Sequence, residues 1–183
     1  MRKIRIKLVF LTVSVLLHTV IQAQLVHTKG SMSLGLDGGY VLDGYHVGSR
    51  YSYLLAGSST LSAYFKYEKN YFEVDNFDLL FYGVDYKFTY FKYGNWLYFD
   101  IGTGFFLSNE FSDSPIFGKV SKFAIGETVF LDVDYYLTTK LIVSACFGQR
   151  FHQLSNLGKL SWYAGLGIYY NINKTKKVKS KFK

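Results

Sequence analysis

The most constraining feature of this chain is residues 160–173, where apolar residues alternate strictly with polar or small ones. Leu166, Ile168 and Tyr170 belong to the apolar set, whereas Gly165 and Gly167 belong to the intervening set. A period of two residues is that of a β-strand whose faces meet two different environments. The stretch is longer than an ordinary globular strand of about 5–6 residues, and it suits a bilayer-crossing strand, which needs roughly 9–11.

Seven earlier segments alternate in the same way. They are residues 32–37, 45–53, 61–68, 80–89, 97–105, 123–135 and 141–150. Aromatic residues make up 20% of the chain and there is one proline, and both features favour sheet. Together with 160–173 the segments form an even set of the smallest size known for bacterial outer-membrane barrels. We therefore predict an all-β fold, an eight-stranded antiparallel up-and-down transmembrane β-barrel of the outer-membrane type.

Alternation alone does not decide which face of the barrel looks inward. A soluble lipocalin-type barrel places its apolar rows inside and its charged rows in water. The strand length, the aromatic content and the lack of a helical period after the first two dozen residues favour a membrane barrel. Aromatics at segment ends, such as Tyr90, Trp96, Tyr136 and Trp162, are expected in the interfacial girdles.

The two ends of the chain differ from its body. Residues 1–23 combine a basic start, an apolar run over 8–17 and a small residue, Ala23, which is typical of a secretory signal peptide. A single transmembrane helix is the alternative, but the run is shorter than the roughly 20 residues required. We expect a signal peptide at 1–23, a barrel domain at 24–173 and a basic tail at 174–183.

Net charge excludes one class of function for the body. The chain carries +8, but four basic residues lie in 1–23 and six in 174–183, with no acid in either segment. The remaining 11 basic residues face 13 acidic ones in 24–173, a balance of −2. Specific nucleic-acid binding by the barrel is therefore not expected.

The segments between the predicted strands set an expected orientation. The connections after the second, fourth and sixth strands read as short turns, the second of them over 90–95. The others are mostly longer or more polar, and the longest is expected over 108–119. Outer-membrane barrels have short periplasmic turns and longer outer loops, which predicts that both termini are periplasmic.

Two residues interrupt the alternation of segment 123–135. Glu127 lies on the apolar row, and Phe130 lies on the polar row. Either a β-bulge shifts the register between them, or the outer end of that strand projects above the lipid. The sequence leaves both possibilities open.

The polar rows predict a set of charged side chains inside the barrel. They are Arg50, Lys66, Glu68, Asp85, Lys87, Asp100, Asp132, Asp134 and Arg150. Eight strands leave an interior that side chains fill, so we expect a paired ion network and no open pore. A proton or ion path through these residues is the alternative.

Chemistry at a catalytic or metal site is not indicated. His46 with Ser49, and His152 with Ser155, are the nearest His–Ser combinations, and neither has a spacing that identifies a catalytic site. The lone Cys146 excludes an intrachain disulfide and suits a small interior position. We expect no enzyme activity, no cofactor, no metal and no small-molecule substrate.

The C-terminal tail has six lysines and no acid. They are Lys174, Lys176, Lys177, Lys179, Lys181 and Lys183. A solvated segment is the simpler interpretation, and contact with an acidic partner, lipid head groups or nucleic acid is the functional one.

Two resemblances add to these patterns. The ending Gly167-x-x-Tyr170-x-Ile172 resembles the C-terminal signal of outer-membrane barrel proteins. Across most of 24–173 the chain resembles the TraO family of conjugative-transposon proteins of Bacteroides-type bacteria. The matching stretches are 29–30, 44–51, 81–86, 99–104, 123–126, 134–143 and 163–170. The segment 107–110 and the lysine tail depart from the family pattern.

Membership would imply an outer-membrane part of the mating apparatus that transfers DNA, in contact with lipid and with other envelope proteins of conjugation. It implies no catalytic residues. A general surface barrel for adhesion or envelope integrity, similar to OmpX or OmpW, is the second hypothesis, and an outer-membrane lipid-modifying enzyme is the third.

Overall fold

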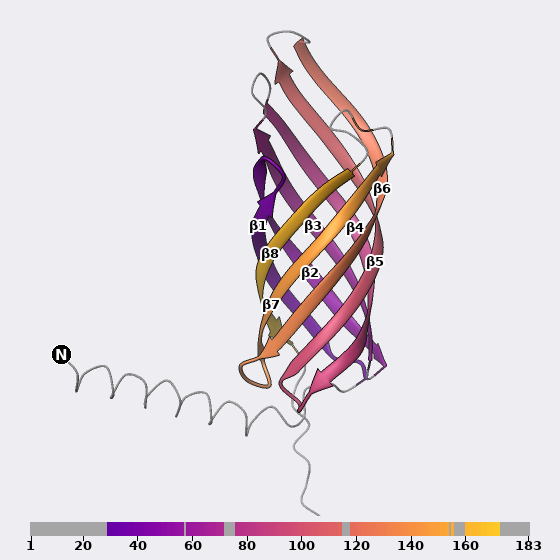
Figure 1. Ribbon diagram of the computed structural model, residues 1–183, viewed down its shortest axis with the longest axis vertical. Helices are drawn as coiled ribbons and strands as arrows, with labels where there is room; N and C mark the ends of the chain where they lie inside the picture. Colours follow the sequence, from indigo (N-terminus) through magenta and orange to yellow (C-terminus); the bar gives the residue numbers. More distant parts are fainter. Residues whose placement is uncertain are drawn as a thin grey trace, which may run out of the picture.

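The structure is a computed structural model that describes residues 29–56, 58–71, 76–114, 118–153, 155 and 160–172. Eight antiparallel strands, each paired with its sequence neighbours, form a closed barrel (Figure 1). They are β1 Met32–Val41, β2 Gly44–Ala56, β3 Ser59–Tyr71, β4 Asn76–Tyr93, β5 Leu97–Ser114, β6 Gly118–Tyr136, β7 Leu141–Gln153 and β8 Leu160–Asn171. The predicted fold class is confirmed. Within the described residues, no helix has the length and apolar character needed to cross a membrane.

The C-terminal strand closes the barrel. β8 pairs with β7 on one side and with β1 on the other, in a register that joins Ser33 to Asn171 and Val41 to Tyr163. The backbone N–H of Ile172 donates to the carbonyl of Met32 at 2.8 Å, just beyond the last strand pair. Residues 29 and 172 therefore lie at one end of the barrel, together with the turns after β2, β4 and β6. We call this the terminal end, and the opposite end the hairpin end.

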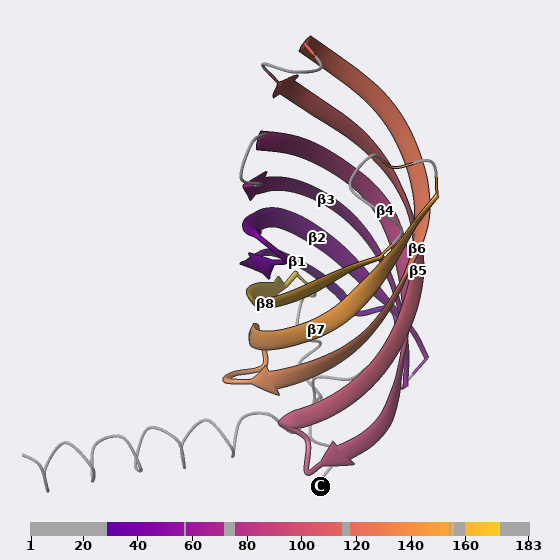
Figure 2. The ribbon, with the colours of Figure 1, turned by 45° about the horizontal axis from the view of Figure 1, so that its top comes forward.

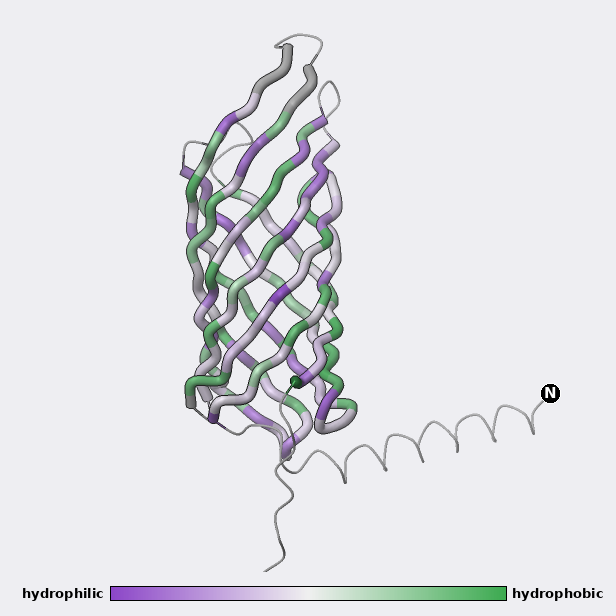
Figure 3. Tube along the Cα trace, turned by 180° about the vertical axis from the view of Figure 1, so that it is seen from behind, coloured by the Kyte–Doolittle hydropathy of each residue, from purple (hydrophilic) through white to green (hydrophobic). Residues whose placement is uncertain are grey.

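Hydropathy changes back and forth along the strands (Figure 3), and the exposed fractions show that the apolar residues face outward and the polar residues inward. Outward residues include Leu36, exposed to 69%, and Leu166, exposed to 67%, whereas the inward Lys66 is exposed to 4%. Apolar rows on the outside suit lipid, because exposure of this apolar surface to water would be unfavourable. The lipocalin-type alternative is therefore wrong.

The predicted loop at 108–119 is largely strand. β5 runs to Ser114 and β6 starts at Gly118, and the two pair without interruption from Leu97↔Tyr135 to Ser114↔Gly118. β6 pairs with β7 only from Ile125 onward, so the β5–β6 hairpin stands above the neighbouring rim (Figures 1 and 2). The polar segment 108–119 therefore belongs to a strand pair that extends beyond its neighbour. One end of the barrel is taller because these strands are longer, and not because a loop is longer.

Two connections also differ from the expected lengths. At the hairpin end, only two residues join β1 to β2, and the second of them, Asp43, has a positive φ of 63°. At the terminal end, β4 continues to Tyr93, so the turn predicted over 90–95 begins at Gly94, whose φ is 60°. Loop length therefore does not distinguish the two ends, and the periplasmic position of the termini stays a prediction.

The irregular positions of β6 are explained without a bulge. Pairing on both sides of Glu127 and Phe130 is continuous, so the bulge alternative is wrong. Glu127 points outward and is exposed, and Phe130 points inward and is 1% exposed. Phe130 fits inside because Gly102 lies opposite it, where an added Cβ would meet the Phe130 ring at 2.2 Å.

Aromatic rings over glycines form much of the interior wall. A Cβ at Gly83 would meet the Tyr64 ring at 2.3 Å, and one at Gly126 would meet the Phe106 ring at 2.4 Å. Tyr136, expected in a girdle, is also buried and packs edge-on against Tyr98 at a ring separation of 5.0 Å. The predicted signal peptide at 1–23 and the tail lysines at 174–183 lie outside the described residues.

Candidate functional site

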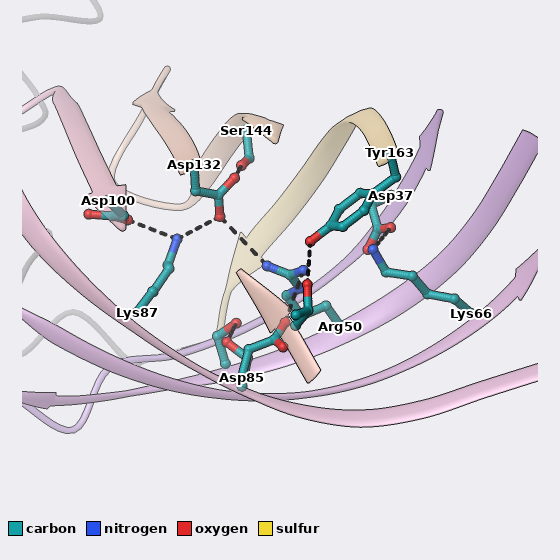
Figure 4. A network of polar contacts seen from close by, with 12 residues as sticks. Asp37, Arg50, Lys66, Asp85, Lys87, Asp100, Asp132, Ser144 and Tyr163 are labelled. Atoms are coloured by element: carbon teal, nitrogen blue, oxygen red, sulfur yellow. Dashed lines mark hydrogen bonds and ion pairs between the residues drawn. The ribbon is translucent and has the colours of Figure 1, made fainter. Parts of the chain in front are cut away.

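The largest charged group of the interior lies toward the terminal end, around Lys87 (Figure 4). The Lys87 Nζ lies 2.9 Å from Asp100, 3.1 Å from Asp132 and 2.5 Å from Asp134. The Ser144 hydroxyl donates a hydrogen bond of 2.7 Å to the other oxygen of Asp132. The ammonium of Lys87, which extends from β4, therefore bridges one carboxylate of β5 and two of β6.

Arg50 of β2 extends this group across the lumen. Its guanidinium lies 3.3 Å from Asp85 and 3.6 Å from Asp132. Because Asp132 also pairs with Lys87, six of the predicted charged residues form one connected network. The network joins β2, β4, β5 and β6, so it ties opposite walls of the barrel together.

The remaining predicted residues form two separate pairs. Lys66 lies 2.9 Å from Asp37, which also faces His46 at 3.7 Å. Arg150 donates to Glu68, and Asn70 donates a second hydrogen bond to that carboxylate at 3.1 Å. The structure thus places all nine predicted residues in the interior, but as one network and two pairs.

Arg150 is also held between two aromatic rings. Its guanidinium lies 4.5 Å from the centre of the Phe81 ring and 4.4 Å from that of Tyr163. Such cation–π contacts strengthen when water is excluded, and Arg150 is only 3% exposed. Lys66 also lies 5.4 Å from the centre of the Tyr163 ring, so the tyrosine contacts both cations.

Toward the hairpin end the interior becomes apolar. Leu79, Phe81 and Phe106 form a buried cluster, and Phe81 meets Phe106 edge-on at 5.3 Å. Just beyond them the buried carboxylate of Glu110 accepts a hydrogen bond from Ser155. These side chains close the lumen above the ion pairs.

The interior has more acids than cations. Among the described buried residues, the cations are Arg50, Lys66, Lys87 and Arg150. The acids are Asp37, Glu68, Asp85, Asp100, Glu110, Asp132 and Asp134. Sequence reasoning missed Asp37, Glu110 and the two inward histidines, His46 and His152. Asp37 and His46 lie on the polar rows of their sequence segments, and that position alone predicts that their side chains face inward.

A small hollow opens at the terminal end. Arg50, Lys87, Asp132 and Asp134 reach it together with hydroxyl and amide side chains such as Ser52 and Asn171. Water can hydrate the charged network from this side. The aromatic cluster lies on the other side of these charges, so the arrangement is a polar core that water reaches from the terminal end.

The structure separates the His–Ser combinations considered from the sequence. His46 points inward and Ser49 lies on the outward row of β2. His152 contacts Ser161 at 2.9 Å, while Ser155 donates to Glu110. The Nδ1 of His152 has no hydrogen-bond partner among the described residues, so a third group that orients the imidazole, as in a catalytic triad, is missing there.

The described residues were also considered for metal binding and for thiol chemistry at Cys146. Within the described ranges, no group of three or more His, Cys, Asp or Glu side chains has a geometry that would hold a metal ion. Cys146 faces the interior and packs against the cluster of Val41, Phe130 and Tyr163. It acts there as a small apolar side chain.

The geometry is that of known outer-membrane barrels. The N-terminal β-barrel domain of Pseudomonas aeruginosa OprF matches with a TM-score of 0.63 and 17% identity, over 78% of this chain and 98% of that one. Neisserial surface protein A matches with a TM-score of 0.61 and 16% identity, over 76% and 95%. Ail, the attachment invasion locus protein of Yersinia pestis, matches with 0.52 and 12%, over 79% and 99%.

These likenesses establish the fold, since the identities are too low to carry function. Comparison with protein-family models gave no match, and neither did comparison with curated protein sequences.

Proposed function

We propose that this protein is a non-enzymatic outer-membrane β-barrel that serves conjugative DNA transfer, either structurally or through partner proteins of the envelope. The observation that carries the proposal is the ordered resemblance to the TraO family across most of 24–173. The stretches fall on six of the eight strands, β2, β4, β5, β6, β7 and β8.

The interior supports a role that does not depend on transport. An interior filled by ion pairs and aromatic rings offers no route for DNA or for a large solute. A few of the matching positions are glycines beneath interior rings, such as Gly83, Gly102 and Gly126. These positions specify the barrel, so partners in transfer would meet its rims or its outer wall.

The test is the frequency of DNA transfer from a donor strain with an in-frame deletion of the gene. We expect transfer to be lost and to be restored by the intact gene supplied in trans. As a control, the deletion strain is complemented with a gene that lacks residues 174–183. This variant separates the role of the tail lysines from that of the barrel. Unchanged transfer in the deletion strain would contradict the proposal.

A general surface barrel for adhesion or envelope integrity is the second candidate. The feature that favours it is the projecting β5–β6 hairpin, which presents strand backbone beyond the rim at 118–124. Ail, one of the similar barrels, is named as an attachment protein. Loss of cell adhesion or of detergent resistance in the deletion strain, with normal transfer, would support this candidate over the first.

The third candidate, a lipid-modifying enzyme, has one observation behind it, the contact of His152 with Ser161. Comparison of outer-membrane lipids from wild-type and deletion strains by mass spectrometry tests it. A modified lipid that disappears with the gene, and also with Ser161→Ala, would replace the non-enzymatic proposal.

A further inference from the structure

One acid stands on the apolar outer wall of the barrel. Glu127 is exposed on β6, and its direct partners across the sheet are Phe105 on β5 and Phe151 on β7. Along its own strand the outward neighbours are Ile125 and Val129. All four neighbours are exposed apolar residues, with Phe105 at 63% and Val129 at 49%. Glu127 has no ion pair or side-chain hydrogen bond among the described residues.

Its depth places this carboxylate within the lipid band. β6 ends at Tyr136, nine residues further toward the terminal end. At about 3.3 Å per residue and a tilt of 35–45°, that separation is roughly 21–24 Å along the barrel axis. The apolar band of these barrels is about 25 Å tall, so Glu127 lies inside it, near one edge. An ionisable residue in such a position is a candidate functional residue.

A second polar side chain lies beside it. Gln149 of β7 points outward, opposite Val129 of β6 and Trp162 of β8. Two residues along a tilted strand descend about 5 Å, and one step across the sheet from β6 to β7 climbs about 3 Å. The wall climbs in that direction, as the position of β8 above β7 shows (Figure 1). Glu127 and Gln149 therefore lie at nearly the same height.

The wall is also hollowed at this place. A shallow open hollow is lined by Leu131, Phe147, Phe151 and Trp162 around Gly148, with Gln149 at its side. Phe147 and Trp162 stack at a ring separation of 5.4 Å and form a flat border. The hollow lies between these outward side chains, so another side chain can approach the backbone of the sheet there.

We propose that this β6–β7 face binds a second copy of the chain within the membrane. Two copies inserted in the same direction are related by a two-fold axis along the membrane normal, so each residue meets a residue at its own height. The Glu127 carboxylate of one copy then accepts a hydrogen bond from the Gln149 amide of the other, and the same contact occurs twice. The hollows beside them receive apolar side chains of the facing wall.

Hydrogen-bond complementarity favours this occupant over lipid. Acyl chains offer no donor to a carboxylate, and anionic phosphate head groups repel it. The amide of Gln149 is a neutral donor at the correct height, and the pair is self-complementary, as an isologous interface requires. The inference depends on the barrel lying in a membrane and not on its role in conjugation.

The test measures distances between copies of the full chain in lipid vesicles, by pulsed electron spin resonance. A spin label is placed at Val129→Cys, in a Cys146→Ser background that leaves Glu127 and Gln149 in place. We expect one narrow distance between copies, whereas a label at Val47→Cys on the opposite wall should give a broad and longer distribution. Heat-dependent migration on gels verifies that each variant is folded.

Variants then assign the contact. Glu127→Leu and Gln149→Leu should each weaken the dimer by roughly tenfold or more, because symmetry removes two hydrogen bonds at once. Glu127→Gln keeps a hydrogen-bonding side chain and should retain most of it. The matched control is Ser49→Leu, which removes an outward polar side chain from β2 on the far wall and should change nothing.

Three outcomes would overturn the proposal. The first is that the labelled chain with Glu127 and Gln149 intact gives no defined distance at Val129→Cys, and the second is that Glu127→Leu leaves the dimer intact. The third is a distance between copies that appears only with lipopolysaccharide and Mg²⁺ and disappears in EDTA. The last outcome would mean that the carboxylate binds lipid phosphate through a metal ion. Normal DNA transfer by a monomeric Glu127→Leu variant would leave the conjugation proposal standing without the dimer.

Discussion

The buried pair of Arg150 and Glu68 provides the most exacting test of how the interior is stabilised. Both residues are nearly inaccessible, at 3% and 2% exposure, so Arg150→Met leaves the Glu68 carboxylate buried without its cation. Removing one partner of such a pair costs about 3–5 kcal/mol. The hydrogen bond from Asn70 still solvates the carboxylate in part, which reduces the cost.

Loss of the two cation–π contacts adds to the cost of Arg150→Met, by about 1–2 kcal/mol for each desolvated contact. Met packs against both rings and recovers some of that. We therefore expect Arg150→Met to lower the free energy of unfolding by about 4 kcal/mol. The double variant Arg150→Met with Glu68→Met removes both charges, and it should lie within about 2 kcal/mol of the wild type.

The assay is reversible urea unfolding in lipid vesicles, followed by the fluorescence of Trp96 and Trp162. Lys140→Met is the control, because it removes an exposed cation beside Tyr170 and should cost about 1 kcal/mol or less. A loss below about 1 kcal/mol for Arg150→Met would show that water or another group compensates Glu68. A double variant as unstable as the single one would show that the aromatic contacts, and not the charge pair, hold this part of the interior.

Three further predictions follow from the packing of the interior. Gly102→Val should cost about 3 kcal/mol or prevent folding, because its Cβ would meet the Phe130 ring at 2.2 Å, and Phe130→Leu in the same chain should recover part of the loss in the urea assay. In planar bilayers the protein should give no steady ion conductance, and stable stepwise currents would contradict the filled interior. Cys146 should react with a maleimide only after unfolding, and rapid labelling of the folded barrel would show that the interior opens.

Sequence reasoning predicted the fold because its signal is physical and local. A two-residue period over eight long segments requires strands with unlike faces, and Leu34 and Leu166 appear on the outer face as expected. The same signal failed at 108–119, because the inward Ser108 and Glu110 are polar and the outward Asn109 between them is polar as well. Without an apolar residue on the outer face there is no alternation, so a strand resembled a loop.

The charged interior was predictable as a set, but its pairing was not. The period assigns Lys66, Arg50 and Asp132 to the inner face, yet which acid meets which cation depends on the stagger of all the intervening strands. Lys66 pairs with Asp37 on β1, two strands away, and Arg50 reaches Asp132 on β6. The packing of Phe130 over Gly102 is equally invisible until the register is known.

The uneven charge of the interior explains why one end is open. Four cations face seven acids among the described buried residues, and the Lys87 network holds four of those acids against two cations. Buried charge without a counter-charge persists only where water or a hydrogen bond compensates it. The hollow at the terminal end brings water to Asp132 and Asp134, whereas the neutral pair of Arg150 and Glu68 lies where aromatic rings exclude it. The interior therefore holds the wall together, and the partners that we propose would meet the surfaces that it stabilises, the projecting β5–β6 hairpin and the outer face that carries Glu127.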